Sequence, residues 1–360
     1  MYKIGLLYGD GIGPEITKAT EEVLKSVTNQ LDIEVEFPVY PMGWEGINDY
    51  QNPVPDITIE GLKTCDAWVF APHDSAAYPD EYFHDRPNPS GTMRQTFRLF
   101  SNARPAKSYP GIKSRVGEAD VIVFRENLEG ELPDRNMFKG YGEFMPSPDV
   151  VVSNSVFTRQ GCEQIAHSAF QMAMTRDKKV TIVHKANVVK MGTGFFRDIC
   201  YEVGEKYYPE VEIDDYHIDA MTAHMVKRLN DFDVIVTTNL FGDILSDLAC
   251  ELTGSLGLGP SINTNENQCM AQAAHGSAPD IAGQNIANPV GLMLSAVMML
   301  DWLATKHEDE RLREASELME ASILQVMKNE TVTPDMGGNE TTTSFTELII
   351  KELEKQTQKV

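Results

Sequence analysis

The sequence predicts an α/β fold built around a largely parallel sheet. Short, uncharged apolar runs alternate along the chain with segments of helical periodicity. Such alternation is typical of βαβ units, whose strands run parallel. At 360 residues the chain also exceeds one ordinary domain, so we expect one large core or two medium ones.

The expected strands are the short buried runs. The first, Ile4–Tyr8, leads through a glycine-rich turn into a helix with Pro14 in its first turn, where proline is tolerated. Apolar residues at three- and four-residue steps between Ile16 and Val27 give this helix one buried face. Further strands are expected at Ala67–Ala71, Ala119–Phe124, Val180–Val183 and Val234–Thr237, and further helices at Gln160–Met174 and Ala287–Trp302.

One segment, Lys139–Val156, breaks this alternation. It begins with a stretch rich in turn-forming residues and ends with the β-branched run Val150–Val156. We interpret it either as an arm that pairs with a partner subunit or as a long surface loop.

The composition excludes several classes of function. A hydrophobic fraction of 42% and a charged fraction of 24% are those of an ordinary globular protein. The net charge of −23 argues against nucleic-acid binding and against docking on an anionic membrane. No apolar run approaches the ~18 residues of a membrane span, and the first strand does not resemble a signal peptide. The five cysteines form no CxxC pair, so we expect a cytoplasmic protein with reduced thiols.

The turn Gly9–Glu15 matches a dinucleotide-binding loop only in part. Its glycines are spaced GxGxG and a proline follows, whereas the Rossmann fingerprint is GxGxxG. A tight strand-to-helix turn is an equally good interpretation.

Three arginines, Arg94, Arg104 and Arg125, are candidates for an anion clamp. The planar guanidinium binds a carboxylate through two charge-assisted hydrogen bonds. Together the three could hold two carboxylates of one substrate, although any one alone is more often part of a surface ion pair.

Two carboxylates follow the expected strand Val234–Thr237. Asp243 and Asp247 stand four residues apart, so on a helix they share a face. Beyond the carboxyl end of a strand, such a pair suits Mg²⁺ or Mn²⁺. The alternative is that Asp243 caps the helix and that Asp247 only stabilises its first turn through the helix dipole.

Two further motifs are a lysine at the end of an expected strand and a loop of small residues before an expected helix. Lys185, at the end of the strand Val180–Val183, could move a proton if its surroundings lower its pKa, although most lysines are simply exposed. The loop from His275 to Gly283 contains small residues that can follow a phosphate or ribose closely, and Asp280 can accept both ribose hydroxyls. In isolation this loop would be interpreted as a turn.

Taken together, and in this order along nearly the whole chain, these motifs resemble the isocitrate/isopropylmalate dehydrogenase family, the metal-dependent β-decarboxylating dehydrogenases. The resemblance implies the isopropylmalate dehydrogenase-like fold with two α/β domains and a dimer-forming arm. Residues 1–101 with 253–360 would form the cofactor-binding domain, and residues 102–252 the substrate, metal and dimerisation domain. It also implies an NAD-dependent oxidoreductase acting on the CH–OH group of a small 3-substituted malate, with decarboxylation, as a homodimer with shared active sites.

The resemblance assigns a role to each candidate residue. Arg94, Arg104 and Arg125 correspond to the clamp on the malate-like moiety, and Lys185 to the residue that handles the hydroxyl proton. The Mg²⁺ or Mn²⁺ ligands would be Asp243 and Asp247, with Asp219 from the neighbouring subunit, which also contributes Lys185. The NAD-binding residues would be His275, Gly276, Ser277, Ala278, Asp280, Ile281 and Asn288, together with Asn187.

The sequence departs from the family pattern at two positions. Leu132 stands where the family has the tyrosine that protonates the enolate after CO₂ leaves; Tyr141 lies nearby and is a possible substitute. Gln272 stands where an acidic residue is usual. The loss at Leu132 leaves a second hypothesis open, a catalytically impaired homologue that acts as a binding or regulatory subunit.

The residues before Arg94 predict a substrate other than 3-isopropylmalate. Ser90 and Gly91 occupy the places where isopropylmalate members carry a bulky apolar pair. Asn88 and Ser90 resemble, in reverse order, the Ser and Asn that hold the γ-carboxylate in isocitrate members. We therefore expect a malate that carries a hydroxyl, a carboxyl-tipped chain or a small group.

Overall fold

The computed structural model describes residues 1–82, 88–137 and 140–357. Its centre is a ten-stranded sheet, which confirms the predicted α/β class. In spatial order the strands are β2 (Val35–Glu36), β1 (Tyr2–Leu7), β3 (Ala67–Phe70), β12 (Cys269–Ala271), β11 (Ile262–Thr264), β4 (Ser101–Lys107), β5 (Asp120–Glu126), β10 (Val234–Thr237), β8 (Lys179–His184) and β9 (Glu212–His217). The pairs β12–β11, β11–β4 and β4–β5 are antiparallel, and the pairs on either side of them are parallel.

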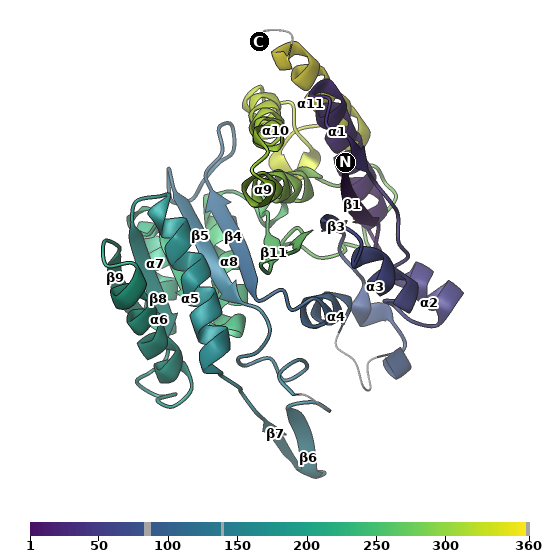
Figure 1. The fold of residues 1–360 in the computed structure, drawn as a ribbon. Coiled ribbons are helices and arrows are strands. Elements are labelled where there is room, and N and C mark those ends of the chain that lie inside the picture. The colour runs from purple at the N-terminus through teal and green to yellow at the C-terminus, as the bar shows by residue number, and fades with distance from the viewer. Residues whose placement is uncertain (83–87, 138–139, 358–360) are drawn as a thin grey trace.

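Helices cover both faces of this sheet (Figure 1). The helices are α1 (Gly13–Gln30), α2 (Trp44–Tyr50), α3 (Asp56–Leu62), α4 (Pro89–Thr96), α5 (Arg159–Met174), α6 (Thr193–Tyr207), α7 (Ile218–Arg228), α8 (Asn239–Thr253), α9 (Val290–His307), α10 (Glu310–Lys328) and α11 (Thr342–Thr357). Strand β10 shows why two layers are needed. Val234 and Val236 pack into the core that includes α5 and α6, whereas Ile235 packs into the core that includes α7 and α8.

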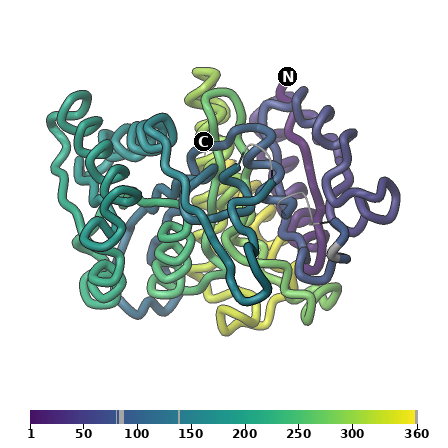
Figure 2. The backbone as a smooth tube through the Cα atoms, turned by 90° about the horizontal axis from the view of Figure 1, so that it is seen from below, coloured from purple at the N-terminus to yellow at the C-terminus, as the bar shows by residue number. Residues whose placement is uncertain are grey.

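The two ends of the chain lie in the same half of the molecule. Helix α1 packs against α11 and α9, and Figure 2 shows the purple N-terminal and yellow C-terminal segments on the same side, with the teal central segment opposite. The central half carries β5, β10, β8 and β9. The division into residues 1–101 with 253–360 and residues 102–252 stays a prediction, and β4, which begins at Ser101, lies at its border.

The segment after residue 139 forms a projecting hairpin. Strands β6 (Glu143–Ser147) and β7 (Val150–Ser153) pair antiparallel and extend away from the body (Figure 1). The predicted run Val150–Val156 is therefore strand only as far as Ser153; Lys139 lies outside the described residues. Phe144, Met145 and Val151 on the hairpin are more than half exposed. That a partner covers them stays a prediction.

Several predicted strands differ from the observed ones by one or two residues at an end, and the bounds predicted for one helix were wrong by more. The expected helix Ala287–Trp302 begins at Val290 and continues to His307. Pro289 precedes the helix, and the Asn288 Oδ1 atom accepts a hydrogen bond from the Val290 amide at 3.0 Å. Because proline disfavours the helical conformation in the residue before it, Asn288 and Ala287 stay outside the helix.

Because β5, β10, β8 and β9 are parallel, their carboxyl ends meet at one edge of the sheet. In the described part of the chain, no helix is long and apolar enough to cross a membrane. All five cysteines are buried and free.

Candidate active site

The register of two strands places the predicted arginines on one face. Asn102 of β4 is paired directly with Arg125 of β5, and directly paired residues point to the same side of a sheet. Arg104 stands two residues from Asn102 and therefore shares that face. The Arg104 Nε atom donates to Asn102 Oδ1 at 2.7 Å, which fixes the plane of its guanidinium.

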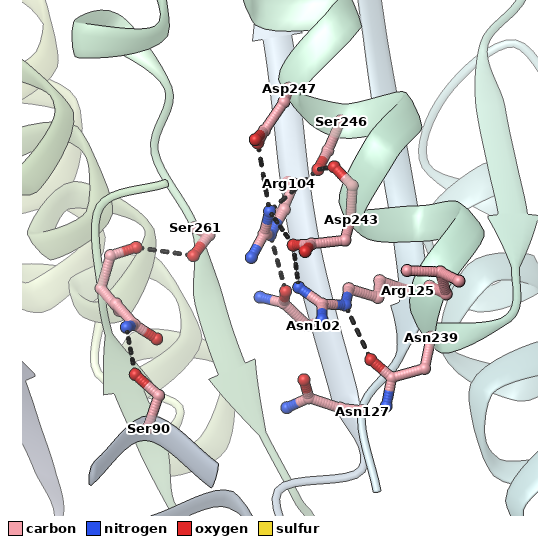
Figure 3. A network of polar contacts seen from close by, with 12 residues as sticks. Ser90, Asn102, Arg104, Arg125, Asn127, Asn239, Asp243, Ser246, Asp247 and Ser261 are labelled. Carbon is pink, nitrogen blue, oxygen red and sulfur yellow. Dashed lines mark hydrogen bonds and ion pairs between the residues drawn. The ribbon is translucent and has the colours of Figure 1, made fainter. Parts of the chain in front are cut away.

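Helix α8 lies over these arginines and presents four polar residues to them: Asn239, Asp243, Ser246 and Asp247. Asn239 Oδ1 accepts from Arg125 Nε at 3.0 Å, and Ser246 Oγ accepts from Arg104 Nη1 at 2.9 Å. Asp243 binds both guanidiniums: its Oδ1 atom is 3.3 Å from Arg104 Nη1 and also accepts from Arg125 Nη1. Figure 3 shows Asp243 between the two arginines.

A glycine allows α8 to approach so closely. A Cβ atom on Gly242 would lie 2.6 Å from the Arg125 Cβ and 3.1 Å from its Cα. Any larger residue at this position would lift α8 away from β5 and separate Asp243 from Arg125.

The clamp arginines are buried and mutually repulsive. Arg94, Arg104 and Arg125 are 5%, 6% and 3% exposed. Burial and the nearby Arg104 lower the pKa of Arg125 to about 9. Burial and the neighbouring arginines also hold the pKa of Arg94 well below its usual range. Several positive charges on neighbouring buried side chains favour an anionic ligand, which would relieve their repulsion.

A fourth arginine, which the sequence did not single out, contributes to this field. Arg135 is buried, and its charge lowers the pKa of both Arg94 and Arg125. Its Nε and Nη2 atoms each donate to the Asp134 carboxylate at 3.0 Å, while Nη1 is buried without a hydrogen bond to any described residue. Asp134 offsets part of this charge, and Arg135 still adds to the repulsion that lowers the pKa of Arg94 and Arg125.

Asp243 and Asp247 form the predicted carboxylate pair. Helix α8 begins at Asn239, with Thr238 as its N-cap residue, so the alternative in which Asp243 caps the helix was wrong. Burial would raise the pKa of Asp243, but Arg125 and Arg104 hold it below its usual value. Burial raises the pKa of Asp247, whose Oδ1 atom is 3.5 Å from Arg104 Nη1 but hydrogen-bonded to no described residue.

This chemistry fits a hard divalent cation. Two carboxylates share a helix face, and Asp247 offers a buried oxygen without a hydrogen-bond donor. Within the described residues of one chain, however, no group of three or more His, Cys, Asp or Glu side chains could hold a metal ion. Asp219 is therefore not brought to the pair by its own chain.

Lys185 and Asp219 lie together at the far side of the same edge. Lys185 follows β8, Asp219 lies in the first turn of α7 after β9, and Lys185 Nζ is 2.5 Å from Asp219 Oδ1. Hydrogen bonding from Lys185 lowers the pKa of Asp219, which is 68% exposed. Because β9 is two strands from β10, roughly 10 Å separate these strand ends.

The predicted cofactor loop packs against the glycine turn of the first strand. The Ile12 amide donates to the Ser277 carbonyl at 2.8 Å, and a Cβ on Gly11 would lie 2.0 Å from that carbonyl oxygen. Gly11 also has a φ of +59°, so glycine is required there twice over. The tight-turn interpretation of Gly9–Glu15 accounts for these contacts.

The loop itself has the properties of a ligand cradle. His275 Nε2 is buried without a hydrogen-bond partner among the described residues, and a Cβ on Gly276 would meet nothing within 4 Å. Asp280 is exposed, and Ile281 and Ala278 pack at the edge of the core. Asn288 donates to Asp335 Oδ2 at 2.9 Å. Asn187 does not join them, because it lies exposed beside Lys185 after β8.

The two departures from the family pattern lie next to residues that contact the site. Next to Leu132, the Glu131 carboxylate accepts from Thr238 Oγ1 at 2.7 Å and from the Leu240 amide at 3.2 Å, which ties this loop to the start of α8. Gln272 accepts from Arg94 Nη2 at 3.3 Å. Asn88 caps α4 through its Oδ1, which accepts from the Gly91 amide at 2.9 Å, while Ser90 is buried.

Comparison with known proteins gives consistent results. A family model described as isocitrate/isopropylmalate dehydrogenase matches residues 3–349. The chain is 40% identical over 347 residues to 3-isopropylmalate dehydrogenase of Archaeoglobus fulgidus, covering 96% of this chain and 97% of that protein. It is 38% identical over 353 residues to isocitrate/homoisocitrate dehydrogenase of Thermus thermophilus, covering 98% of each. The crystal structure of isocitrate dehydrogenase from Methylococcus capsulatus has a TM-score of 0.87 at 34% identity, with 98% of this chain and 99% of that chain covered.

Proposed function

Because the chain belongs to the isocitrate/isopropylmalate dehydrogenase family, an NAD-dependent decarboxylating group of oxidoreductases, we propose that it oxidises a small 3-substituted malate at its 2-hydroxyl group and then decarboxylates it. The observation that carries this proposal is the buried cluster of Arg94, Arg104 and Arg125 beside the Asp243–Asp247 pair. A dianionic substrate and a divalent cation would together neutralise both halves of that cluster.

The arginines would bind and orient the substrate. Arg104 and Arg125 bind Asn102 and Asn239 through their Nε atoms and residues of α8 through their Nη1 atoms. Their Nη2 atoms would then bind the carboxylates. Holding both carboxylates fixes the C2–H bond relative to the cofactor, which is the positioning that hydride transfer requires.

Asp243 and Asp247 would hold Mg²⁺ or Mn²⁺, with Asp219 of a second subunit completing the site. A bound divalent cation supplies Lewis-acid polarisation of the substrate hydroxyl and carboxylate oxygens. Lys185 would handle the hydroxyl proton at its Nζ atom, which must be uncharged when it accepts that proton. Within one chain this nitrogen is paired with Asp219, so both would reach the site of the opposite subunit as a unit.

The loop His275–Ile281 with Asn288 would bind NAD, which supplies the hydride acceptor. Asp280, exposed on this loop, would accept hydrogen bonds from the adenosine ribose hydroxyls. Its charge would disfavour the 2′-phosphate of NADP. Asn187, beside Lys185, would contribute from the second subunit.

The group on C3 of the substrate is set by α4. The relatives are named for isopropylmalate, isocitrate and homoisocitrate, so family membership leaves this group open. Ser90 and Gly91 supply a buried hydroxyl and a bare backbone where a branched apolar group would need an apolar wall. We therefore favour a substituent with an oxygen atom, or a small one, over isopropyl.

A second candidate function is a catalytically impaired binding or regulatory subunit. Leu132 motivates it, because leucine cannot protonate the enolate left by CO₂. The two functions predict different outcomes for the purified protein with NAD⁺, Mg²⁺ and malate, tartrate, isocitrate and 3-isopropylmalate. Formation of NADH and of CO₂ in equal amounts supports the active dehydrogenase. NADH without CO₂ supports oxidation alone, and tight substrate binding without NADH supports the regulatory subunit.

A further inference from the structure

A chain of four side chains runs beside the clamp, and the sequence alone gave no sign of it. Ser90 and Arg94 stand one turn apart on α4 and so share a face. Gln272, at the end of β12, bridges them: its Nε2 lies 2.8 Å from Ser90 Oγ, and its Oε1 lies 3.3 Å from Arg94 Nη2. His73, after β3, places its Nε2 2.9 Å from the same Ser90 Oγ.

The orientation of the Gln272 amide follows from Arg94. A guanidinium has donors and no acceptor, so the atom that faces it must be the amide oxygen. Asn263 Nδ2, 3.4 Å from the same Oε1 atom, is a second donor to it. The amide nitrogen is thereby turned towards Ser90 and donates to the Ser90 hydroxyl oxygen.

The tautomer of His73 follows from its other ring nitrogen. Burial and the charge of Arg94 lower the pKa of His73 to about 4, so the ring is neutral near pH 7. Its Nδ1 atom is buried with no hydrogen-bond partner among the described residues. An orphaned N–H costs more than an orphaned lone pair, so the proton belongs on Nε2. His73 then also donates to the Ser90 oxygen.

A serine hydroxyl has two lone pairs and one proton. With both lone pairs occupied by His73 and Gln272, only the proton is left for another partner. Figure 3 shows Ser90 on one side and Arg104, Asn102 and Asn127 on the other. A substrate bound between them would be that partner.

We propose that His73 and Gln272 are positioning residues that lock Ser90 as a hydrogen-bond donor, and that Ser90 thereby selects a substrate with a hydrogen-bond acceptor on C3. This inference rests on the proposed function and narrows its substrate class. A carboxylate tip satisfies the donor. An alkyl group of the same shape leaves it buried and unpaired.

Gln272→Glu would reverse the direction of the hydrogen bond between residue 272 and Ser90, with little change in side-chain shape. The introduced carboxylate can only accept, so it would bind Arg94 with one oxygen and take the Ser90 proton with the other. Ser90 would then present a lone pair instead of a proton towards the substrate.

The test compares two isosteric substrates in the full-length protein with NAD⁺ and Mg²⁺. Isocitrate carries a carboxymethyl group on C3, and 3-isobutylmalate carries an alkyl group with the same heavy-atom shape. We expect the unaltered protein to favour isocitrate in kcat/KM by about ten- to a hundredfold. Ser90→Ala and Gln272→Glu should each lower that ratio by about tenfold. Gln171→Glu, the same change at an exposed position on α5, is the matched control and should leave the ratio unchanged.

The double variant Ser90→Ala, Gln272→Glu distinguishes an effect of Gln272 that acts through Ser90 from direct repulsion of the substrate by the new charge. If Gln272 acts through Ser90, adding Gln272→Glu to Ser90→Ala changes the ratio no further. A further drop in the double variant would mean that the new charge alone repels isocitrate, and would overturn the relay.

Malate, which has no C3 substituent, distinguishes failure of the inference from failure of the proposed function. Two results with turnover of malate overturn the inference alone: an isocitrate to isobutylmalate ratio near one in the unaltered protein, or a ratio that Ser90→Ala and Gln272→Glu leave unchanged. No turnover of malate or either analogue overturns both.

Discussion

Lys185 and Asp219 form an ion pair at 2.5 Å across the ends of β8 and β9. The pair lies at the same edge of the sheet as Asp243 but is separated from it by the strand order. Two groups with expected roles in one reaction are therefore joined to each other and not to the remainder of the site in their own chain. A second chain that supplies this pair would complete both centres of a dimer.

Mixing two inactive variants tests this shared arrangement. Lys185→Ala and Asp243→Asn each damage one half of a centre, so a hybrid dimer would contain one intact centre and one doubly damaged one. Random exchange of equal amounts should restore about a quarter of the unaltered activity, because half of the dimers are hybrids with one working centre each. Subunit exchange verified by differently tagged chains, with activity no higher than that of either variant, would contradict a shared site.

Activity should require a divalent cation held by the α8 carboxylates. Asp243→Asn or Asp247→Asn should lower kcat/KM at least about a hundredfold, because several kcal/mol of charge stabilisation is lost. Asp301→Asn, at an exposed ion pair with Arg313, is the matched control. Steady-state rates across a Mg²⁺ titration provide the measurement, and full turnover in excess EDTA would refute the metal role.

NAD⁺ should be preferred over NADP⁺. Lost hydrogen bonds and a like-charge contact at Asp280 amount to about 1–3 kcal/mol, or roughly tenfold or more in kcat/KM. Asp280→Asn should narrow that preference. A higher kcat/KM with NADP⁺ for the unaltered protein would show that Asp280 does not face the ribose.

The free energy of unfolding should depend on pH through a buried glutamate, Glu126, at the end of β5. Burial, reinforced by Glu129, raises the pKa of Glu126 to about 7. The folded chain then keeps a proton that the unfolded chain loses near pH 4.5, so this group lowers the free energy of unfolding as pH rises through that window. The decline amounts to roughly 3 kcal/mol.

Glu126→Gln cannot ionise and should lack this decline. The free energy of unfolding of the variant minus that of the unaltered protein should therefore be larger at pH 8 than at pH 5 by about that amount. Any cost of a changed hydrogen bond that is the same at both pH values cancels in this comparison. Urea unfolding of both proteins at the two pH values, at one protein concentration, gives the comparison. An unchanged difference would mean that Glu126 titrates normally.

The strands could be predicted well because their signal is local. The strand Val234–Thr237 has the predicted bounds, since four consecutive buried residues serve both faces of the sheet. The helix expected from Ala287 starts three residues later. The apolar periodicity continues back past Pro289, but proline disfavours the helical conformation in the residue before it.

The site could be predicted only as far as its chemistry is visible in residue types. Arg104, Arg125 and Asp243 stood out by charge and position. Asn102 did not, since its function depends on pairing opposite Arg125 in a register that the sequence does not display. His73 was missed for the same reason: its partner, Ser90, comes from another element.

The most direct test of the central claim is the ranking of kcat/KM for malate, tartrate, isocitrate and 3-isopropylmalate, measured as NADH formation with saturating NAD⁺ and Mg²⁺. The buried arginine clamp predicts turnover of malate-type acids, and the Ser90 hydroxyl predicts that the best substrate carries an oxygen atom or only a small group on C3. If 3-isopropylmalate gives the highest value, the account of the C3 pocket is wrong; if none of the four yields NADH, the assignment as an active dehydrogenase is wrong.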